Sequence, residues 1–161
     1  MSSLKITNLT CPGCSAEGEF KYYASVNVTL DPDLRDKIMD GSLFRWTCPS
    51  CGKVFNVPYP FLYHDMTRGF MLMFDPGRSH IIPFAEQIRV LENGLDIRTV
   101  YSIESDYMES HPKMNLLFDG LSDGKDLIFT VQEMPDRTWG PTDRKHTVSF
   151  EDYQKVKDTI Q

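Results

Sequence analysis

The sequence of 161 residues has no long hydrophobic run and no excess of positive charge. Its longest apolar run, Phe70 to Phe74, is far shorter than the roughly 20 residues that cross a bilayer. The N-terminal residues are polar and include two cysteines, so we expect no secretory signal. Lysine and arginine number 17 against 23 acidic residues, and the net charge of −6 disfavours a general binder of polyanions. We therefore expect a cytoplasmic protein that does not associate with membranes.

Motifs of common catalytic chemistry are also missing. There is no Gly-x-Gly-x-x-Gly and no Gly-Lys-Ser/Thr phosphate loop. His80, His111 and His146 are scattered without the spacing of a metal-binding helix, which disfavours a metal site built on histidine. His64 precedes Asp65, but neighbours in a strand point to opposite faces, so we interpret them as a structural histidine and a turn-forming aspartate. No catalytic constellation is recognised, and the sequence leaves open whether the protein is an enzyme.

The four cysteines are the sharpest pattern that is present. They form two pairs, Cys11-Pro12-Gly13-Cys14 and Cys48-Pro49-Ser50-Cys51, separated by 33 residues. Two such turns supply four thiolates at about 2.3 Å from one ion, the arrangement that Zn²⁺ prefers. Backbone N–H groups of each turn can point back at its first sulfur. The predicted ligands of a structural Zn²⁺ are Cys11, Cys14, Cys48 and Cys51.

Each pair taken alone has other interpretations. Cys-Pro-x-Cys also occurs in thioredoxin-like oxidoreductases, where a helix follows and lowers the thiol pKa. Neither pair here precedes a convincing helix, and duplication favours one shared metal. Thiol redox chemistry and structurally inert cysteines remain as alternatives. Gly52 suits a positive φ after the second pair, whereas Ser15 holds that place in the first, so we expect the two turns to differ in tightness.

The cysteine pairs are farther apart than in most four-cysteine sites, where about 15–20 residues separate them. Residues 19–30 alternate between apolar and polar and predict a strand. Asp31-Pro32 predicts a helix start, with Asp31 as its cap, and Gly41 ends that helix. Residues 43–47 predict a strand that leads into the second pair. We therefore expect an elaborated zinc ribbon with a strand–helix insertion, packed with a C-terminal α+β part.

The rest of the chain predicts further α+β structure. The sequence favours one domain over 1–161, with a sub-boundary near 58–60 that separates a zinc-ribbon unit (1–57) from a mixed remainder (61–161). Strands are predicted at 53–58, 70–74, 97–101, 126–134 and 146–149, and helices at 83–93, after Ser102, and from a capping box at Ser149. We interpret as pliable core the methionines Met66, Met71, Met73, Met108 and Met114.

These motifs resemble a known family. The two Cys-Pro-x-Cys pairs, the helix segment from Asp31-Pro32 to Asp40-Gly41-Ser42-Leu43, and the run Phe61-Leu62-Tyr63-His64-Asp65 are similar to the CpXC domain family of small, mostly bacterial proteins. The similarity is specific through about residue 76 and looser through Arg98–Ser102. It implies cytoplasmic zinc binding by the four cysteines and implies no activity.

Basic residues offer little support for nucleic-acid binding. Near the metal, Lys21, Arg45 and Lys53 are expected to offset a site charge of about −2. Farther on, acidic residues interrupt the basic and aromatic group Arg137, Trp139, Arg144 and Lys145. The favoured hypothesis is a non-catalytic module that binds a protein or ligand. The alternatives are an enzyme with its site in the C-terminal half, a thiol redox switch and a nucleic-acid binder.

Overall fold

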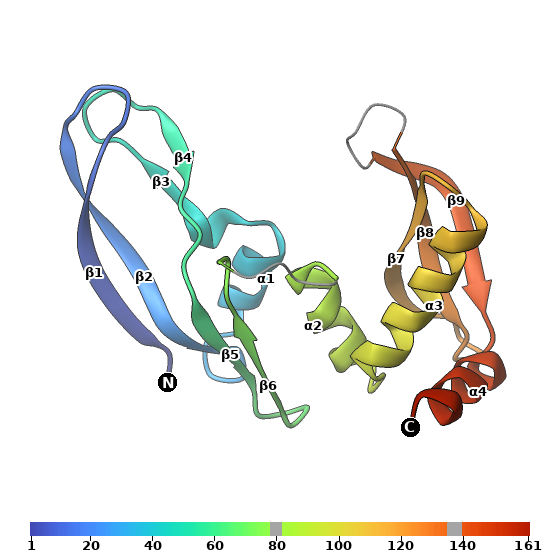
Figure 1. Cartoon of the computed structure of the whole chain (residues 1–161). Coiled ribbons are helices and arrows are strands. Elements are labelled where there is room, and N and C mark those ends of the chain that lie inside the picture. Colours follow the sequence, from blue (N-terminus) through green and yellow to red (C-terminus); the bar gives the residue numbers. More distant parts are fainter. Residues whose placement is uncertain (78–81, 135–139) are drawn as a thin grey trace. The chain divides into compact units, whose positions relative to one another are not determined.

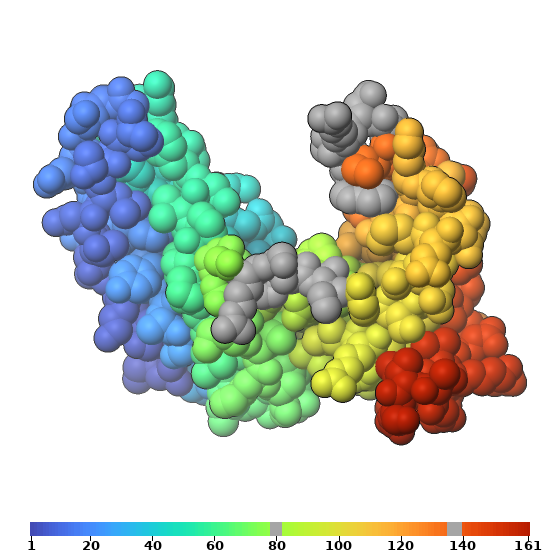
Figure 2. All heavy atoms as spheres, in the orientation of Figure 1, coloured from blue at the N-terminus to red at the C-terminus, as the bar shows by residue number. Residues whose placement is uncertain are grey.

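A computed structural model describes residues 1–77, 82–134 and 140–161 of the chain (Figure 1). The chain divides into two units, Met1–Ser79 and His80–Gln161 (Figure 2). Each unit contains helices and strands (Figure 1). The fold class is therefore α+β, as predicted. None of the helices in the described ranges combines the length and apolar character that a membrane crossing requires.

The first unit contains a four-stranded sheet in which β2 and β5 run parallel and the other pairs antiparallel. A parallel pair needs a long connection between its strands. Here that connection carries the second cysteine pair. In sheet order the strands are β1 (Ser3–Thr10), β2 (Glu17–Asn27), β5 (Phe61–Asp65) and β6 (Phe70–Phe74).

The connection between β2 and β5 contains the predicted helix and strand. Its elements are α1 (Asp33–Met39), the short 3₁₀ helix η1 (Ser42–Phe44), β3 (Arg45–Thr47) and β4 (Val54–Asn56). The predicted cap of α1 is wrong, because the helix has no side-chain cap and the Asp31 carboxylate instead accepts hydrogen bonds from Ser2 N and Oγ. Gly41 follows α1 with a φ of 78°, as a helix stop requires.

Aromatic side chains form the core of the first unit. The ring centroids of Phe44 and Tyr59 lie 5.2 Å apart, and Phe74 lies 5.4 Å from both Phe44 and Phe61. Phe20 contacts Tyr59 edge-to-face. Leu34 and Ile38 of α1 are also buried. This packing joins β2, η1, β5 and β6 into one unit that extends past the expected sub-boundary at 58–60.

The opposite face of the sheet is exposed, and this corrects the interpretation of the methionines. Met71 and Met73 alternate with inward residues of β6 and are each 57% exposed, and the β1 residues Leu4 and Ile6 are exposed on the same face. Met66 and Met108 are also exposed. Of the five methionines, only Met114 packs against a core, that of the second unit.

The second unit has an antiparallel sheet, and two of its three helices, the first and the second, contact the first strand of that sheet. Its strands are β7 (Met114–Leu121), β8 (Leu127–Glu133) and β9 (Gly140–Val148), and its helices are α2 (Phe84–Glu92), α3 (Ile97–Ser110) and α4 (Phe150–Ile160). The core includes Leu116, Phe118 and Phe129, all fully buried, and Tyr153 of α4. The sequence predicted α2, β8 and α4 correctly, and Ser149 Oγ accepts from Asp152 N at the start of α4.

Two sequence-based assignments in the second unit are wrong. Residues 97–101 form the first turns of α3 rather than a strand, and Ser102 is inside that helix. The cap is Asp96, whose carboxylate accepts from Thr99 N and Oγ1. An aspartate three residues before a threonine was therefore a stronger start signal than the β-branched run that followed it.

Candidate metal centre

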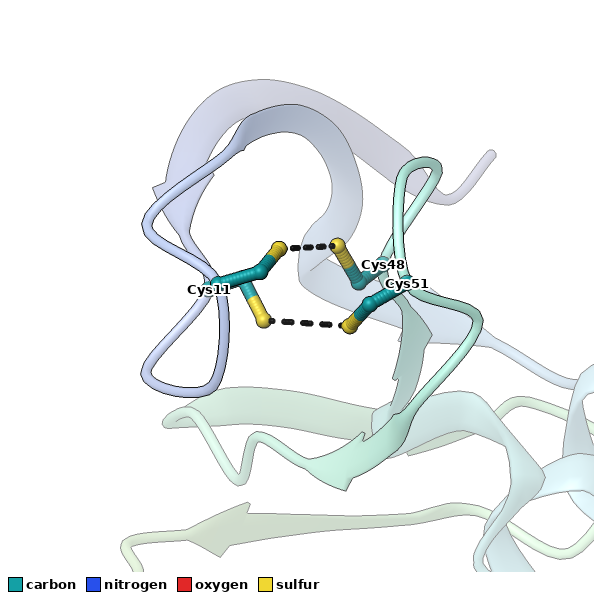
Figure 3. Close-up of side chains that lie close together, drawn as sticks. Cys11, Cys48 and Cys51 are labelled. Atoms are coloured by element: carbon teal, nitrogen blue, oxygen red, sulfur yellow. Dashed lines mark hydrogen bonds between the residues drawn. The ribbon is translucent and has the colours of Figure 1, made fainter.

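The four cysteines lie in two turns, each placed by a pair of strands. Cys11 and Cys14 lie in the turn between β1 and β2, and Cys48 and Cys51 lie in the turn between β3 and β4 (Figure 3). Both strand pairs are antiparallel, so each turn is the tip of a hairpin. The first cysteine of each turn is buried and the second is exposed.

The two turns have the same backbone hydrogen bonds. In the first turn Ser15 N donates to Cys11 O and Cys11 N donates to Ala16 O. The second turn repeats both bonds, Gly52 N to Cys48 O and Cys48 N to Lys53 O. Ser15 and Gly52 have φ values of 63° and 72°, so the expected difference between the turns is wrong. The shared bonds hold Ser15 in a left-handed conformation that costs a non-glycine residue about 1–2 kcal/mol.

The sulfur atoms have the spacing of a tetrahedral metal site. Cys11 Sγ lies 3.7 Å from Cys51 Sγ, Cys14 Sγ lies 3.6 Å from Cys48 Sγ, and all four sulfurs lie within 4.8 Å of one another (Figure 3). Four sulfurs at the Zn–S distance are about 3.8 Å apart in a regular tetrahedron. All four cysteines are free, so no disulfide accounts for their proximity. The cluster could therefore hold a metal ion.

Backbone N–H groups act on the first sulfur of each turn, as the sequence predicted. Gly13 N lies 3.3 Å from Cys11 Sγ. In the second turn, hydrogen bonds from the N–H groups of Cys51 and Ser50 help to lower the pKa of Cys48 to about 6. The Lys53 N–H favours the Cys51 thiolate, but desolvation and the adjoining thiols raise the pKa of Cys51 to about 11. Four adjacent thiolates need a positive charge between them, which a metal dication supplies.

Gly18 and Trp46 bring the two hairpins together, and the sequence had singled out neither. A Cβ on Gly18 would lie 2.8 Å from Pro49 Cδ and 2.9 Å from Trp46 Cζ2, so only glycine allows this approach. Trp46, buried in β3, packs against Phe55 of β4 with the two rings tilted and their centroids 6.0 Å apart. A glycine inside an alternating strand was the available signal, because such a residue often marks a close approach.

The charged residues expected near the site are only partly there. A Cβ on Gly13 would lie 3.2 Å from Lys53 Cδ and Nζ, which places the Lys53 side chain beside the first turn. Arg45 instead donates to Asp40 O after α1. Lys21 lies in β2 opposite Ile6. Of these three residues, Lys53 is the one whose side chain the structure places beside a cysteine turn.

The structure also locates the other residues that the sequence singled out. His64 and Asp65 lie on opposite faces of β5, as predicted: His64 pairs with Met71, and the buried Asp65 binds Arg68 N and Nη1 in the following turn. Within the described ranges, the four cysteines are the only group of three or more metal-ligating side chains.

The remaining candidates supply no ligand set. His111 and His146 both contact the ring of Tyr107. Arg144 pairs with Glu133, and Lys145 pairs with Asp119. Arg144 and Lys145 are therefore partnered. Two predictions lie outside the described residues, namely His80 as a scattered histidine and the basic–aromatic pair Arg137 and Trp139.

Comparison with known families confirms the resemblance in the first unit. The family described as CpXC protein matches residues 9–83, a range that includes both cysteine turns, the strands β2, β5 and β6 of the sheet, and the last two residues of β1. The looser similarity at Arg98–Ser102 lies beyond this match. No curated protein and no solved structure matches the chain.

Proposed function

From the CpXC match over residues 9–83, we propose that the protein binds one Zn²⁺ through Cys11, Cys14, Cys48 and Cys51 in an elaborated zinc ribbon. The observation that carries the proposal is the sulfur spacing of 3.6 and 3.7 Å, which fits the Zn–S tetrahedron. An all-sulfur tetrahedron is typical of zinc or iron, and Zn²⁺ undergoes no redox change. Reduced thiols also fit the cytoplasm, the location we propose.

The proposed zinc has a structural role. Four cysteines fill the four positions of a tetrahedral ion, so no position is open for water or substrate. The turns they occupy are the tips of two hairpins that come from distant parts of the chain. A bound ion would join these tips, and the free energy of binding would add to the stability of both hairpins.

For the whole protein we propose a non-catalytic module that binds a protein or ligand. The exposed apolar face of the first unit, which includes Leu4, Ile6, Met71 and Met73, supports a binding role. The net charge of −6 and the partnered Arg144 and Lys145 disfavour nucleic acid as the partner.

Metal analysis tests the zinc proposal. Protein purified without chelator should contain one zinc per chain, and Cys48→Ser should contain well under one. An exposed serine substitution, Ser50→Ala, is the matched control in the same turn and should keep its zinc. Iron in place of zinc, or less than half an equivalent of any metal in the wild type, would refute it.

A pull-down tests the module. Partners retained by the wild type and lost by the doubly charged variant Met71→Lys/Met73→Lys, with circular dichroism unchanged, would support binding through the exposed face. Mild peroxide distinguishes the redox switch, since reversible zinc release with paired disulfides would favour that alternative.

A further inference from the structure

The second unit contains a buried pair of acidic side chains, remote in sequence from the cysteines. Glu86 of α2 is 1% exposed and Glu104 of α3 is 3% exposed, and their carboxyl groups are hydrogen-bonded to each other. Buried glutamates are rare unless they are paired with a charge or a donor. Two carboxylates in contact in a low-dielectric core cannot both be ionised.

Glu86 has a clear structural role at the edge of the sheet. Strand β7 is at the end of the order β7-β8-β9, so among the described residues no strand pairs with the backbone groups on its outer edge. Glu86 Oε1 accepts a hydrogen bond of 2.8 Å from Phe118 N. Arg89, one turn later in α2, donates Nε to Phe118 O at 3.1 Å. The two side chains of α2 therefore form the hydrogen bonds to Phe118 N and O that a neighbouring strand would otherwise form, and they cover this edge of the sheet.

The Glu104 carboxyl group can donate a hydrogen bond in this core only if it is protonated. Its Oε1 is buried and has no hydrogen-bond partner, and Glu86 is the one residue that its carboxyl group contacts by a hydrogen bond in the described part of the chain. Glu86 Oε1 accepts from Phe118 N, and in the same arrangement an O–H of Glu104 can donate to the Glu86 carboxylate.

On the neighbouring elements that the structure describes, the polar and charged groups Asp119, Tyr153 and Arg89 have other partners. On β7, Asp119 binds Lys145 at 2.9 Å, and on α4 the Tyr153 hydroxyl accepts from Asp96 N at 2.8 Å. Arg89 uses its Nε on Phe118 O. Burial, followed by the hydrogen bond and the charge of Glu86, raises the pKa of Glu104 to about 11.

We propose that Glu86 and Glu104 share one proton, donated by Glu104, and that this proton holds α2 and α3 together against the edge of β7. An unfolded glutamate loses its proton near pH 4.5, so the second unit takes up a proton when it folds at neutral pH. The contribution of this proton to the stability of the second unit is therefore fully present at acidic pH. It falls as the pH rises toward the pKa of the folded pair. Alkaline conditions, or any event that ionises Glu104, should loosen α2 first.

Carbon-13 NMR of the full chain tests the shared proton directly. The carboxyl carbon of one of the two glutamates should have the chemical shift of a protonated acid at pH 7, when free glutamate is ionised. Ionised shifts for both at pH 7 would overturn the proposal. This measurement uses the wild type and does not depend on the folding of a variant.

Urea unfolding from pH 6 to 9 tests the coupling to stability, with the folded fraction of α2 and β7 read by a brief hydrogen-exchange pulse at one fixed pH. In Glu104→Gln the amide N–H still donates to Glu86, but the side chain takes up no proton on folding. The unfolding constant of the wild type, divided by that of Glu104→Gln, should rise about tenfold per pH unit. The control Glu109→Gln, exposed on the same helix, should follow the wild type. Equal pH slopes for the wild type and Glu104→Gln would overturn the proposal.

Discussion

The indole Nε1 of Trp46 donates a hydrogen bond to the carbonyl oxygen of Glu19, 3.2 Å away. Trp46 lies in β3, directly before the second cysteine turn, and Glu19 lies in β2, shortly after the first. This bond therefore links the two hairpins whose tips carry the cysteines. It gives the arrangement of the four sulfurs a support that does not depend on the metal.

Trp46→Phe should remove this hydrogen bond, because phenylalanine has no N–H, but it keeps an aromatic ring in β3. We expect a loss of about 1 kcal/mol in the stability of the first unit, because one hydrogen bond is lost and the Glu19 carbonyl loses its donor. Zinc competition with a chromophoric chelator should show a correspondingly weaker metal affinity. Phe55→Leu, which changes the aromatic neighbour of Trp46 but keeps the hydrogen bond, is the comparison. An affinity equal to that of the wild type would show that the bond does not position the turns.

Gly18→Ala should separate the two hairpins. The new methyl group would lie under 3 Å from Pro49 and Trp46, so one of the hairpins must move. We expect a loss of roughly 1–3 kcal/mol, the usual cost of overpacking, together with weaker zinc binding. Gly120→Ala is the control, since nothing lies within 4 Å of its Cβ position. Equal stability of the two variants in urea would contradict the close approach.

The two cysteine turns should respond in opposite directions to matched substitutions. Gly52→Ala places a Cβ in a left-handed conformation and should destabilise the site by about 1–2 kcal/mol, although the space around it is open. Ser15→Gly relieves the same strain in the first turn and should be neutral or stabilising. Thermal unfolding of the metal-loaded protein measures both. A loss of stability in Ser15→Gly would mean that its hydroxyl has a role of its own.

The first unit should lose stability in acid through Asp65. Burial alone would raise the pKa of this carboxyl, but hydrogen bonds from Arg68 N and its guanidinium outweigh burial and hold the pKa below the ordinary value. The stabilisation is therefore present above the unfolded pKa near 4 and is lost as the pH falls through the folded value. Asp65→Asn should flatten the dependence of the urea midpoint on pH between about 5 and 2. The exposed Asp36→Asn should keep the slope of the wild type.

Substitutions on the two faces of the four-stranded sheet should differ strongly. Met73→Gln should change stability by no more than about 0.5 kcal/mol, because its side chain is 57% exposed. Tyr63→Ala should cost roughly 3–5 kcal/mol, because Tyr63 is fully buried on the other face. Chemical denaturation distinguishes the two. A large loss in Met73→Gln would show that this face is covered in solution.

Local signals in the sequence predicted the cluster of four cysteines and most of the elements. The cysteine spacing identified the cluster, strict alternation identified β2, and the capping box at Ser149 identified α4. These predictions succeeded because each depends on residues close together in the chain. The strands β1 and β7 and most of β9 were missed. Strands β1 and β9 carry many polar residues and are specified by pairing with β2 and β8.

Other features could not be read from the sequence because they depend on contacts between distant residues. Residues 97–101 are β-branched enough to predict a strand, yet the Asp96 cap and packing on β7 favour a helix. Glu86 and Glu104 look like ordinary surface residues of two helices until the fold brings them together. The methionines of β6 were assigned to the core because hydrophobicity alone does not indicate which face of a sheet is covered.

The parallel pairing of β2 with β5 has a kinetic consequence. It closes a chain loop between Asn27 and Phe61, and a metal held by Cys14 and Cys48 would close a loop that overlaps it. Once one of the two loops is closed, fewer residues remain free in the other loop. The entropic cost of closing the second loop is therefore lower. Metal capture should therefore speed the formation of this non-local strand pair, the slowest kind of contact to form in a small protein.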